Sequence, residues 1–153
     1  GPRPRPSRRL LMRFVVDASV AVKWLVAEDD ADIAEALATG GHALHAPRLM
    51  ASEITNALWR KARTGEIERR AAGILLGDVQ DMPVRWGADE ILSPNAARLA
   101  LALDHPIYDC VYLALAHRLG ARVVTADRRF ANAVATTEHG ESVLTLADYA
   151  ETR

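Results

Sequence analysis

The sequence contains one cysteine, Cys110, among its 153 residues. A single cysteine excludes an internal disulfide framework and a zinc site built from several cysteines, and it is typical of a reducing compartment. We therefore expect the protein to be cytoplasmic. Cys110 itself lies in an apolar segment with no histidine or other base beside it, so we interpret it as a small core residue and not as a nucleophile.

Long hydrophobic runs are also missing. No apolar run approaches the roughly 18 to 20 residues needed to span a bilayer, so we expect no membrane segment. The apolar stretch at 10–12 is too short for a secretory signal. We interpret residues 1–11, with three prolines and four arginines, as a disordered leader, either a cloning remnant or an alternative upstream start. Residues 12–153 would then form a single domain.

A large excess of positive charge is absent. The net charge is −1, and because four arginines lie in the leader, residues 12–153 carry 15 basic and 20 acidic side chains, a net charge of −5. That balance argues against a protein that holds nucleic acid on a broad cationic surface. A polyanion would have to be bound locally.

The pattern that is present alternates short apolar runs with amphipathic segments, which predicts an α/β fold: a short, mostly parallel sheet of about five strands covered by helices on both faces. Hydrophobic residues make up 50% of the chain, enough for a substantial core. The strands are expected at residues 14–16, 42–46, 84–86, 122–125 and 142–144. The helices are expected at residues 18–26, 30–39, 48–63, 66–81, 93–104, 110–119, 128–135 and 147–151.

Four acidic residues fall at positions that suggest a shared site. Asp17 ends the first strand and Asp127 follows the fourth, and in open α/β sheets ligands bind beyond the carboxyl ends of the strands. Asp109 opens a helix, and Glu53 lies on the border of an apolar helical stripe with no lysine or arginine three or four residues away. A buried carboxylate needs a partner charge, and oxygen-only ligands suit Mg²⁺ or Mn²⁺.

Each acid also has a simpler interpretation. Asp17, Asp109 and Asp127 could each cap the helix that follows, a role worth roughly 1 kcal/mol. Glu53 could occupy an ordinary solvated helix position. The metal hypothesis rests on the four together, because clustered carboxylates repel one another unless a cation joins them.

The sequence resembles the PIN-domain nucleases and, among them, the VapC-type toxins of type II toxin–antitoxin systems. The resemblance covers nearly all of residues 12–135 and rests on four segments in the family's order: VVDASVAVKW, APRLMASEITNALWR, YDCVYLALAHRLGA and VVTADRRFANA. It implies a PIN-like α/β/α sandwich that cleaves RNA phosphodiester bonds with a metal-activated water, using Mg²⁺ or Mn²⁺.

The resemblance also implies roles for individual residues. The catalytic and metal-binding acids would be Asp17, Glu53, Asp109 and Asp127. The residues that support these acids would be Ser19, Asn56 and Thr125. VapC-type toxins are usually homodimers silenced by a small antitoxin that places a basic side chain among the acids, so the implied partners are RNA, a cognate antitoxin and a second copy of the chain.

Basic residues near these segments are weaker candidates. Contacts to RNA phosphates are hypothesised for Lys23, Arg60, Arg128 and Arg129, although ordinary solvated helix faces explain them as well. Lys61 and Arg63 belong to the same group.

Several alternatives stay open. A noncatalytic PIN-like module that binds RNA or protein would share the fold but would not cleave RNA. Cleavage of DNA by the same acids is another. A phosphoryl-transfer receiver is disfavoured, because neither Lys23 nor Lys61 lies at the end of a late strand. The sequence leaves open which RNA is cut and how many metal ions are bound.

Overall fold

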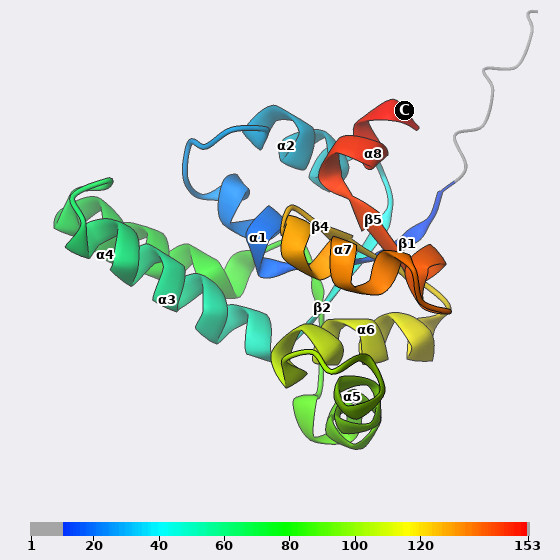
Figure 1. Cartoon of the computed structure of the whole chain (residues 1–153). Helices are drawn as coiled ribbons and strands as arrows, with labels where there is room; N and C mark the ends of the chain where they lie inside the picture. Colours follow the sequence, from blue (N-terminus) through cyan, green and yellow to red (C-terminus); the bar gives the residue numbers. More distant parts are fainter. Residues whose placement is uncertain (1–10, 153) are drawn as a thin grey trace, which may run out of the picture.

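The computed structural model describes residues 11–152 and shows a sheet enclosed by helices (Figure 1). The strands are β1 (Arg13–Val16), β2 (Ala43–Pro47), β3 (Arg85–Gly87), β4 (Arg122–Thr125) and β5 (Val143–Thr145). The helices of the described residues are α1 (Ala18–Ala21), α2 (Ala31–Thr39), α3 (Leu49–Arg63), α4 (Arg69–Asp78), α5 (Asp89–Leu103), α6 (Ile107–Leu119), α7 (Arg128–Ala135) and α8 (Leu146–Glu151). Short 3₁₀ turns add η1 (Val22–Trp24), η2 (Val79–Asp81) and η3 (Gly140–Ser142).

The sheet has the order β3-β2-β1-β4-β5, and each of its four pairings is parallel. The chain winds outward from β1 to β3 and then returns to place β4 on the other side of β1. The winding therefore reverses between β1 and β4, and the loops that leave their carboxyl ends diverge at this point. The predicted α/β fold with about five parallel strands is confirmed.

The α6 helix forms the centre of the core. It packs on β1, β2 and β4, with α5 against its outer side, while α2 and α8 lie across the sheet from it (Figure 1). Every residue from Cys110 to Ala116 is buried. A helix that is apolar on all sides is stable only when it is enclosed, which explains why this segment shows little amphipathic pattern. The first turn of α6 lies at the carboxyl edge of the sheet.

The α3 and α4 helices form a hairpin that projects from the sheet (Figure 1). The apolar side of α3 buries Met50, Ile54 and Leu58. The helix is followed by Gly65, whose φ of +79° is the left-handed conformation that glycine adopts without strain. Because the apolar side of α3 is buried, its polar side faces the carboxyl edge of the sheet and solvent.

Two helices begin three or four residues earlier than predicted. Ser93 and Pro94 lie inside α5, which begins one turn earlier at Asp89. The acidic side chains of its first turn interact favourably with the helix dipole, and the Ser93 hydroxyl donates to the Asp89 carbonyl oxygen at 2.6 Å. The α6 helix begins at Ile107, directly after Pro106. Asp109 is therefore a residue of the first turn and not the residue that precedes the helix.

The prediction of a disordered leader at residues 1–11 concerns residues that, apart from Leu11, lie outside the described part of the chain. Within residues 11–152 no single helix has the length and apolar character needed to cross a membrane. The α5 and α6 helices meet those criteria only as a pair, and they are bent by 117° at the break between them.

Candidate active site

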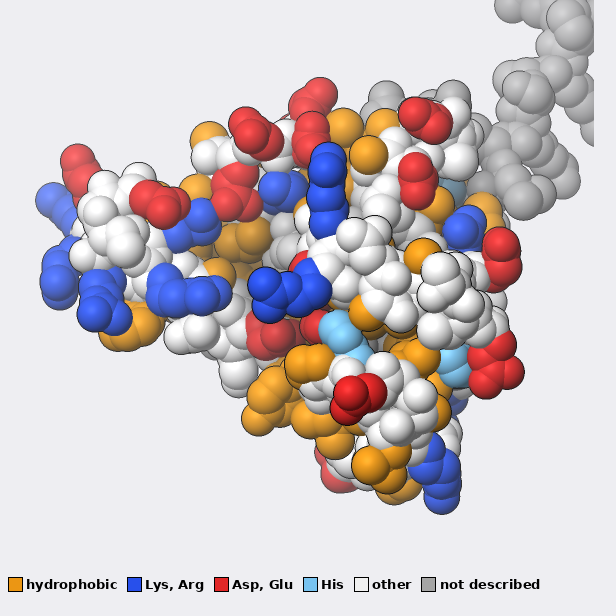
Figure 2. All heavy atoms as spheres, viewed as in Figure 1, with side chains coloured by type: hydrophobic (Ala, Val, Ile, Leu, Met, Phe, Trp, Pro, Cys, Tyr) orange, Lys and Arg blue, Asp and Glu red, His pale blue; other side chains and the backbone are white. Residues whose placement is uncertain are grey.

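A cavity of about 440 Å³ opens where the carboxyl ends of β1 and β4 face the α3 helix. Carboxylates and cations gather around this hollow, between α7 and the α3–α4 hairpin (Figure 2). The structure brings the four acids singled out in the sequence to this one cavity and adds a fifth; the acids that line it are Asp17, Glu28, Glu53, Asp109 and Asp127.

Asp17 is the most enclosed of these acids, with 5% of its surface exposed. It occupies the position before α1, but its side chain does not cap that helix. Its Oδ2 atom instead accepts hydrogen bonds from Thr125 Oγ1 at 2.7 Å and Ser19 Oγ at 2.8 Å. Burial raises the pKa of Asp17 to about 6; the two hydroxyls lower it, and the charges of neighbouring acids raise it further.

The two hydroxyls are themselves fixed by the backbone of the neighbouring strand end. Ala126 N donates to Ser19 Oγ at 2.9 Å, and Asp127 N donates to Thr125 Oγ1 at 3.0 Å. Because each hydroxyl has one proton and already accepts a bond from the backbone, that proton is directed to Asp17. Ser19 and Thr125, the two hydroxyl residues named from the resemblance, thus both contact the acid at the end of β1.

Glu53 projects from α3 and is held by a residue that the sequence had not singled out. Tyr112 of α6 donates its phenol proton to Glu53 Oε1 at 2.5 Å. Burial raises the pKa of Glu53, the Tyr112 bond offsets part of that rise, and the charges of Asp109 and Asp89 add to it. Burial, together with the charges of Asp17 and Glu53, raises the pKa of Tyr112 far above its ordinary value, so the phenol stays protonated and remains a donor.

Asp109 in the first turn of α6 also has an unexpected partner. His105 Nε2 lies 2.7 Å from Asp109 Oδ2, and the histidine side chain is 8% exposed. The His105 ring stacks at a tilt against Phe130 of α7, with ring centroids 5.5 Å apart. The four-residue spacing between His105 and Asp109 is visible in the sequence, but the sequence analysis did not single out His105, which lies in the loop before α6.

Asp127 is the acid for which the capping interpretation holds. Its Oδ1 atom accepts hydrogen bonds from Arg129 N at 2.9 Å and Phe130 N at 3.3 Å, which closes the first turn of α7. For Asp17 and Asp109 the structure replaces capping with side-chain hydrogen bonds. Capping therefore does not explain why the acids converge.

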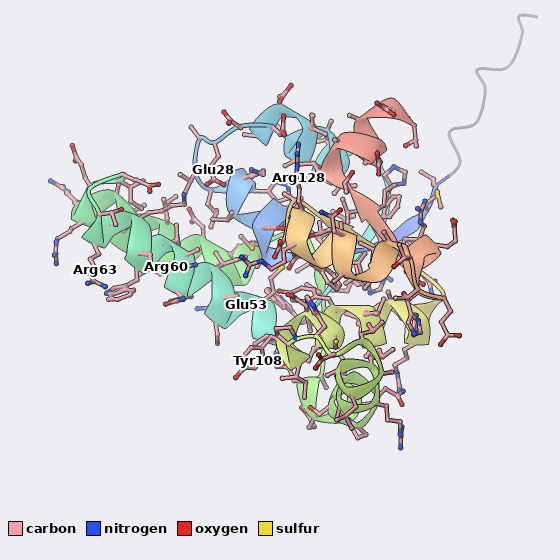
Figure 3. All side chains as sticks on the ribbon, in the orientation of Figure 1. Glu28, Glu53, Arg60, Arg63, Tyr108 and Arg128 are labelled. Carbon is pink, nitrogen blue, oxygen red and sulfur yellow. The ribbon has the colours of Figure 1, made fainter. Side chains whose placement is uncertain are left out.

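The cations predicted to contact RNA divide into two groups. Lys23 and Arg60 line the cavity together with Lys61. Arg128 and Arg129 lie on α7 and are not part of the lining, and Figure 3 shows the Arg128 side chain directed away from Glu53.

Asn56, predicted to support the acids, lies elsewhere. It is exposed, and it lines a second groove with Trp59 and Leu76 on an adjacent face of α3. At 3.6 residues per turn Asn56 sits about 60° around the helix from Glu53, and that rotation carries its amide away from the acidic cavity.

The lining fits a divalent cation in its chemistry. Its acidic side chains offer hard oxygen donors, which Mg²⁺ and Mn²⁺ prefer. Burial is the main cause of the raised pKa of Asp17 and the charges of Asp109 and Glu53 add to it, so a cation beside this carboxylate would lower the pKa. Among residues 11–152, however, no group of three or more histidine, cysteine, aspartate or glutamate side chains is arranged so that it could hold a metal ion in this structure.

Comparison with known proteins places these features in a family context. Residues 14–135 match the family model of the PIN domain. The chain is 32% identical over 122 residues to a protein of Pyrobaculum aerophilum named Ribonuclease VapC3, an alignment that covers 78% of this chain and 93% of the relative.

Solved structures share the fold. The crystal structure of PAE2754 from Pyrobaculum aerophilum superposes with a TM-score of 0.65 at 25% identity, over 92% of this chain and 90% of that one. A toxin–antitoxin complex from Klebsiella pneumoniae contains a chain that matches with a TM-score of 0.57 at 14% identity, over 86% of this chain and 96% of that one.

Proposed function

This chain belongs to the PIN domain family, and from that membership we propose that it is a metal-dependent endoribonuclease, the toxin of a toxin–antitoxin pair. The relative with 32% identity is named a ribonuclease, and the match to the PIN family model, residues 14–135, contains all four acids. The observation that carries the proposal is the convergence of Asp17, Glu53, Asp109 and Asp127 on one cavity at the reversal point of the sheet.

In this proposal the cation is Mg²⁺ or Mn²⁺, held by Asp17, Glu53 and Asp109 with Asp127 as a further ligand. When bound, such an ion polarises the scissile phosphate and lowers the pKa of water so that it can act as the nucleophile. It also reconciles an acidic cavity with a polyanionic substrate, because its charge offsets that of the carboxylates.

The protein's own residues hold the carboxylates in place for this chemistry. Ser19 and Thr125 fix the rotamer of Asp17 through bonds of 2.8 and 2.7 Å. Tyr112 of α6 holds Glu53, and His105 of the preceding loop holds Asp109. Partners of this kind restrict how a ligand side chain can turn, which lowers the cost of ordering it when an ion binds.

Lys23 and Arg60 line the same cavity and supply positive charge toward the RNA backbone. The phosphate contacts are few and local, as the overall acidity of the chain requires. Arg128 and Arg129 would contact RNA only beyond the cavity, along the surface of α7.

The partners follow from the same family membership. A small antitoxin would place a basic side chain among the acids, where it would neutralise them and block the metal site. The chain would act in the cytoplasm and form a homodimer. Mixing the purified protein with the product of the neighbouring gene tests the antitoxin, since the expected result is a stable complex without ribonuclease activity.

The direct test incubates total RNA with the purified protein in Mg²⁺, in Mn²⁺ or in chelator, and maps the new RNA ends by sequencing. Discrete cuts are expected with either metal and none with chelator. Asp109→Asn should abolish the cuts, whereas Asp32→Asn, an equal charge change at an exposed position of α2, should preserve them. Equal behaviour of Asp109→Asn and the unmodified protein, or no cleavage at all, would favour the noncatalytic binding module, and cleavage of DNA alone would identify a different nuclease.

A further inference from the structure

The rim of the acidic cavity contains a carboxylate that is already paired with two cations. Glu28 lies on the loop between η1 and α2, above the α3 helix that carries Glu53 and Arg60 (Figure 3). Its Oε2 atom is 2.7 Å from Lys61 Nζ, and its Oε1 atom is 3.6 Å from Lys23 Nζ. All three side chains line the cavity. An acid and two bases thus meet at the entrance to the site where a polyanion would enter.

The identity of the two cations is informative. The chain has 17 arginines and two lysines, and both lysines reach this one carboxylate. A lysine ammonium is a compact point charge with three donors that can turn toward whichever anion is present, whereas a guanidinium has a fixed planar geometry. Lys23 and Lys61 are therefore suited to exchange one anion for another.

The surrounding contacts hold the two ammonium groups at the rim independently of Glu28. Lys23 Nζ donates to the Asp29 carbonyl oxygen at 2.8 Å, and Lys61 Nζ donates to Glu66 Oε2 at 3.2 Å. The side chains of Lys23 and Lys61 are 13% and 17% exposed. The hydrogen bond to Glu28 raises the pKa of Lys61, which stays protonated.

We infer that Lys23 and Lys61 form a binding site for a backbone phosphate of the substrate RNA, and that Glu28 occupies this site in the free protein until the phosphate displaces it. The inference rests on the proposed function, because it takes RNA as the ligand. Glu28 belongs to a loop and is 23% exposed, so it can leave without disturbing a helix. Partly exposed ion pairs are weak, and a phosphate offers several charged oxygens to the two ammonium groups together.

Because Glu28 already occupies the site, a ligand binds the two lysines only if its affinity is high enough to displace this carboxylate. A single small anion must compete with a tethered carboxylate, whereas RNA adds the other contacts along the cavity and displaces Glu28 as part of a larger interface. Glu28 then occupies the phosphate site in the free protein, and a ligand must bind the two lysines more tightly in order to displace it. If the carboxylate only tied the loop to α3, its removal would weaken RNA binding or leave it unchanged.

The test measures the dissociation constant of a short, fluorescently labelled single-stranded RNA of mixed sequence in Mg²⁺, with Asp17→Asn in every variant so that the RNA is not cut. Glu28→Gln keeps a side-chain oxygen that can accept from Lys61, so the loop retains its fold. This variant is expected to bind RNA several-fold more tightly. Lys23→Met and Lys61→Met are each expected to bind about tenfold more weakly, with the salt slope of binding lowered by about 0.7 for each lost phosphate contact.

Glu66→Gln is the matched control. It makes the same charge change at the other carboxylate that contacts Lys61, but Glu66 is 61% exposed and lies outside the cavity lining. A gain for Glu28→Gln that exceeds the gain for Glu66→Gln, and that disappears when Lys61→Met is added, supports the inference. No gain beyond that of Glu66→Gln, or weaker binding, overturns it.

The failure of this inference and that of the proposed function are read in different assays. RNA cleavage by the unmodified protein tests the function, and the binding series reads the phosphate site whether or not cleavage occurs. Thermal melts of each variant show whether it is folded, and the double variant Glu28→Gln/Lys61→Met decides the question if Lys61→Met alone is unstable.

Discussion

The ends of β1 and β4 present the same local arrangement with opposite results. Each strand runs into the loop at the reversal point of the sheet, and each is followed by an aspartate directly before a helix, Asp17 before α1 and Asp127 before α7. Asp127 caps its helix through two backbone N–H groups. Asp17 leaves its helix uncapped and turns to Ser19 and Thr125.

The difference lies in what the neighbouring strand end supplies. In the turn after β4, the N–H groups of Ala126 and Asp127 donate to the hydroxyl oxygens of Ser19 and Thr125. The protons of these two hydroxyls are thereby left to point at Asp17. The helix that follows Asp17 has four residues, so its capping contributes little. Asp17 is thus a buried acid whose hydrogen bonds do not serve its helix, and Asp127 is an acid whose hydrogen bonds close the first turn of α7.

The largest expected difference between Asp17 and Asp127 is in the rate of RNA cleavage. Asp17→Asn is expected to lower the RNA cleavage rate by on the order of 10³-fold, because the substitution removes the charge that would hold the cation. Asp127→Asn retains the cap and is expected to lose on the order of tenfold. Initial rates on a defined RNA at saturating Mg²⁺ measure both. Equal losses would show that the two strand ends share one role.

The second expected effect is a pH dependence of the folding stability that comes from Asp17. The pKa of Asp17 is raised from 3.8 to about 6, so the folded state retains a proton that the unfolded state releases. Stability from this group is therefore full below about pH 4, falls as pH rises toward 6 and is lost above it, a change of about 3 kcal/mol at 1.36 kcal/mol per pKa unit. Glu53 shifts in the same direction.

Asp17→Asn removes the titrating carboxyl group and, with it, this pH-dependent contribution to stability. In chelator at pH 8 the variant is expected to be more stable than the unmodified protein by up to about 3 kcal/mol, and the two should converge near pH 4. Urea unfolding at a series of pH values measures the difference. A variant that is less stable at pH 8 would show that the charged Asp17 is not strained in the metal-free protein.

The sequence anticipated this comparison only in part. The alternation of strands and helices was sufficient to place Asp17 and Asp127 at strand ends, because a parallel sheet aligns the carboxyl ends of its strands. It did not distinguish their roles, since both satisfy the local pattern of an N-cap. The distinction depends on Thr125, which lies 108 residues from Asp17 along the chain.

Other omissions have the same origin. Tyr112 belongs to a motif visible in the sequence, but its contact with Glu53 spans 59 residues and depends on how α6 packs beside α3. Asn56 was assigned from the resemblance to the PIN-domain nucleases, and the rotation of α3 against the sheet places it on another surface. Spacing along a helix predicts which residues are neighbours, whereas packing decides which of them face the cavity.

Thr125 joins the two strand ends, and its removal should affect both. Thr125→Val keeps the shape of the buried side chain but leaves the Asp127 N–H without its acceptor and Asp17 without one of its two donors. We expect a loss of about 2 kcal/mol in the free energy of unfolding and a lower cleavage rate at unchanged KM. Thr125→Ser, which retains the hydroxyl, should restore the rate, and a valine variant with full activity would remove Thr125 from the positioning of Asp17.

The smallest effect concerns the cap itself. Asp127→Ala removes the acceptor of the Arg129 and Phe130 N–H groups and is expected to cost about 1 kcal/mol, whereas Asp127→Asn caps equally well and should cost almost nothing. The difference between the two variants isolates the cap, because both lose the charge. If alanine and asparagine reduced cleavage equally while only alanine lowered stability, the structural and chemical roles of Asp127 would be separate properties of one side chain. An equal loss of stability in both variants would mean that the charge of Asp127, and not its hydrogen bonds, stabilises the start of α7.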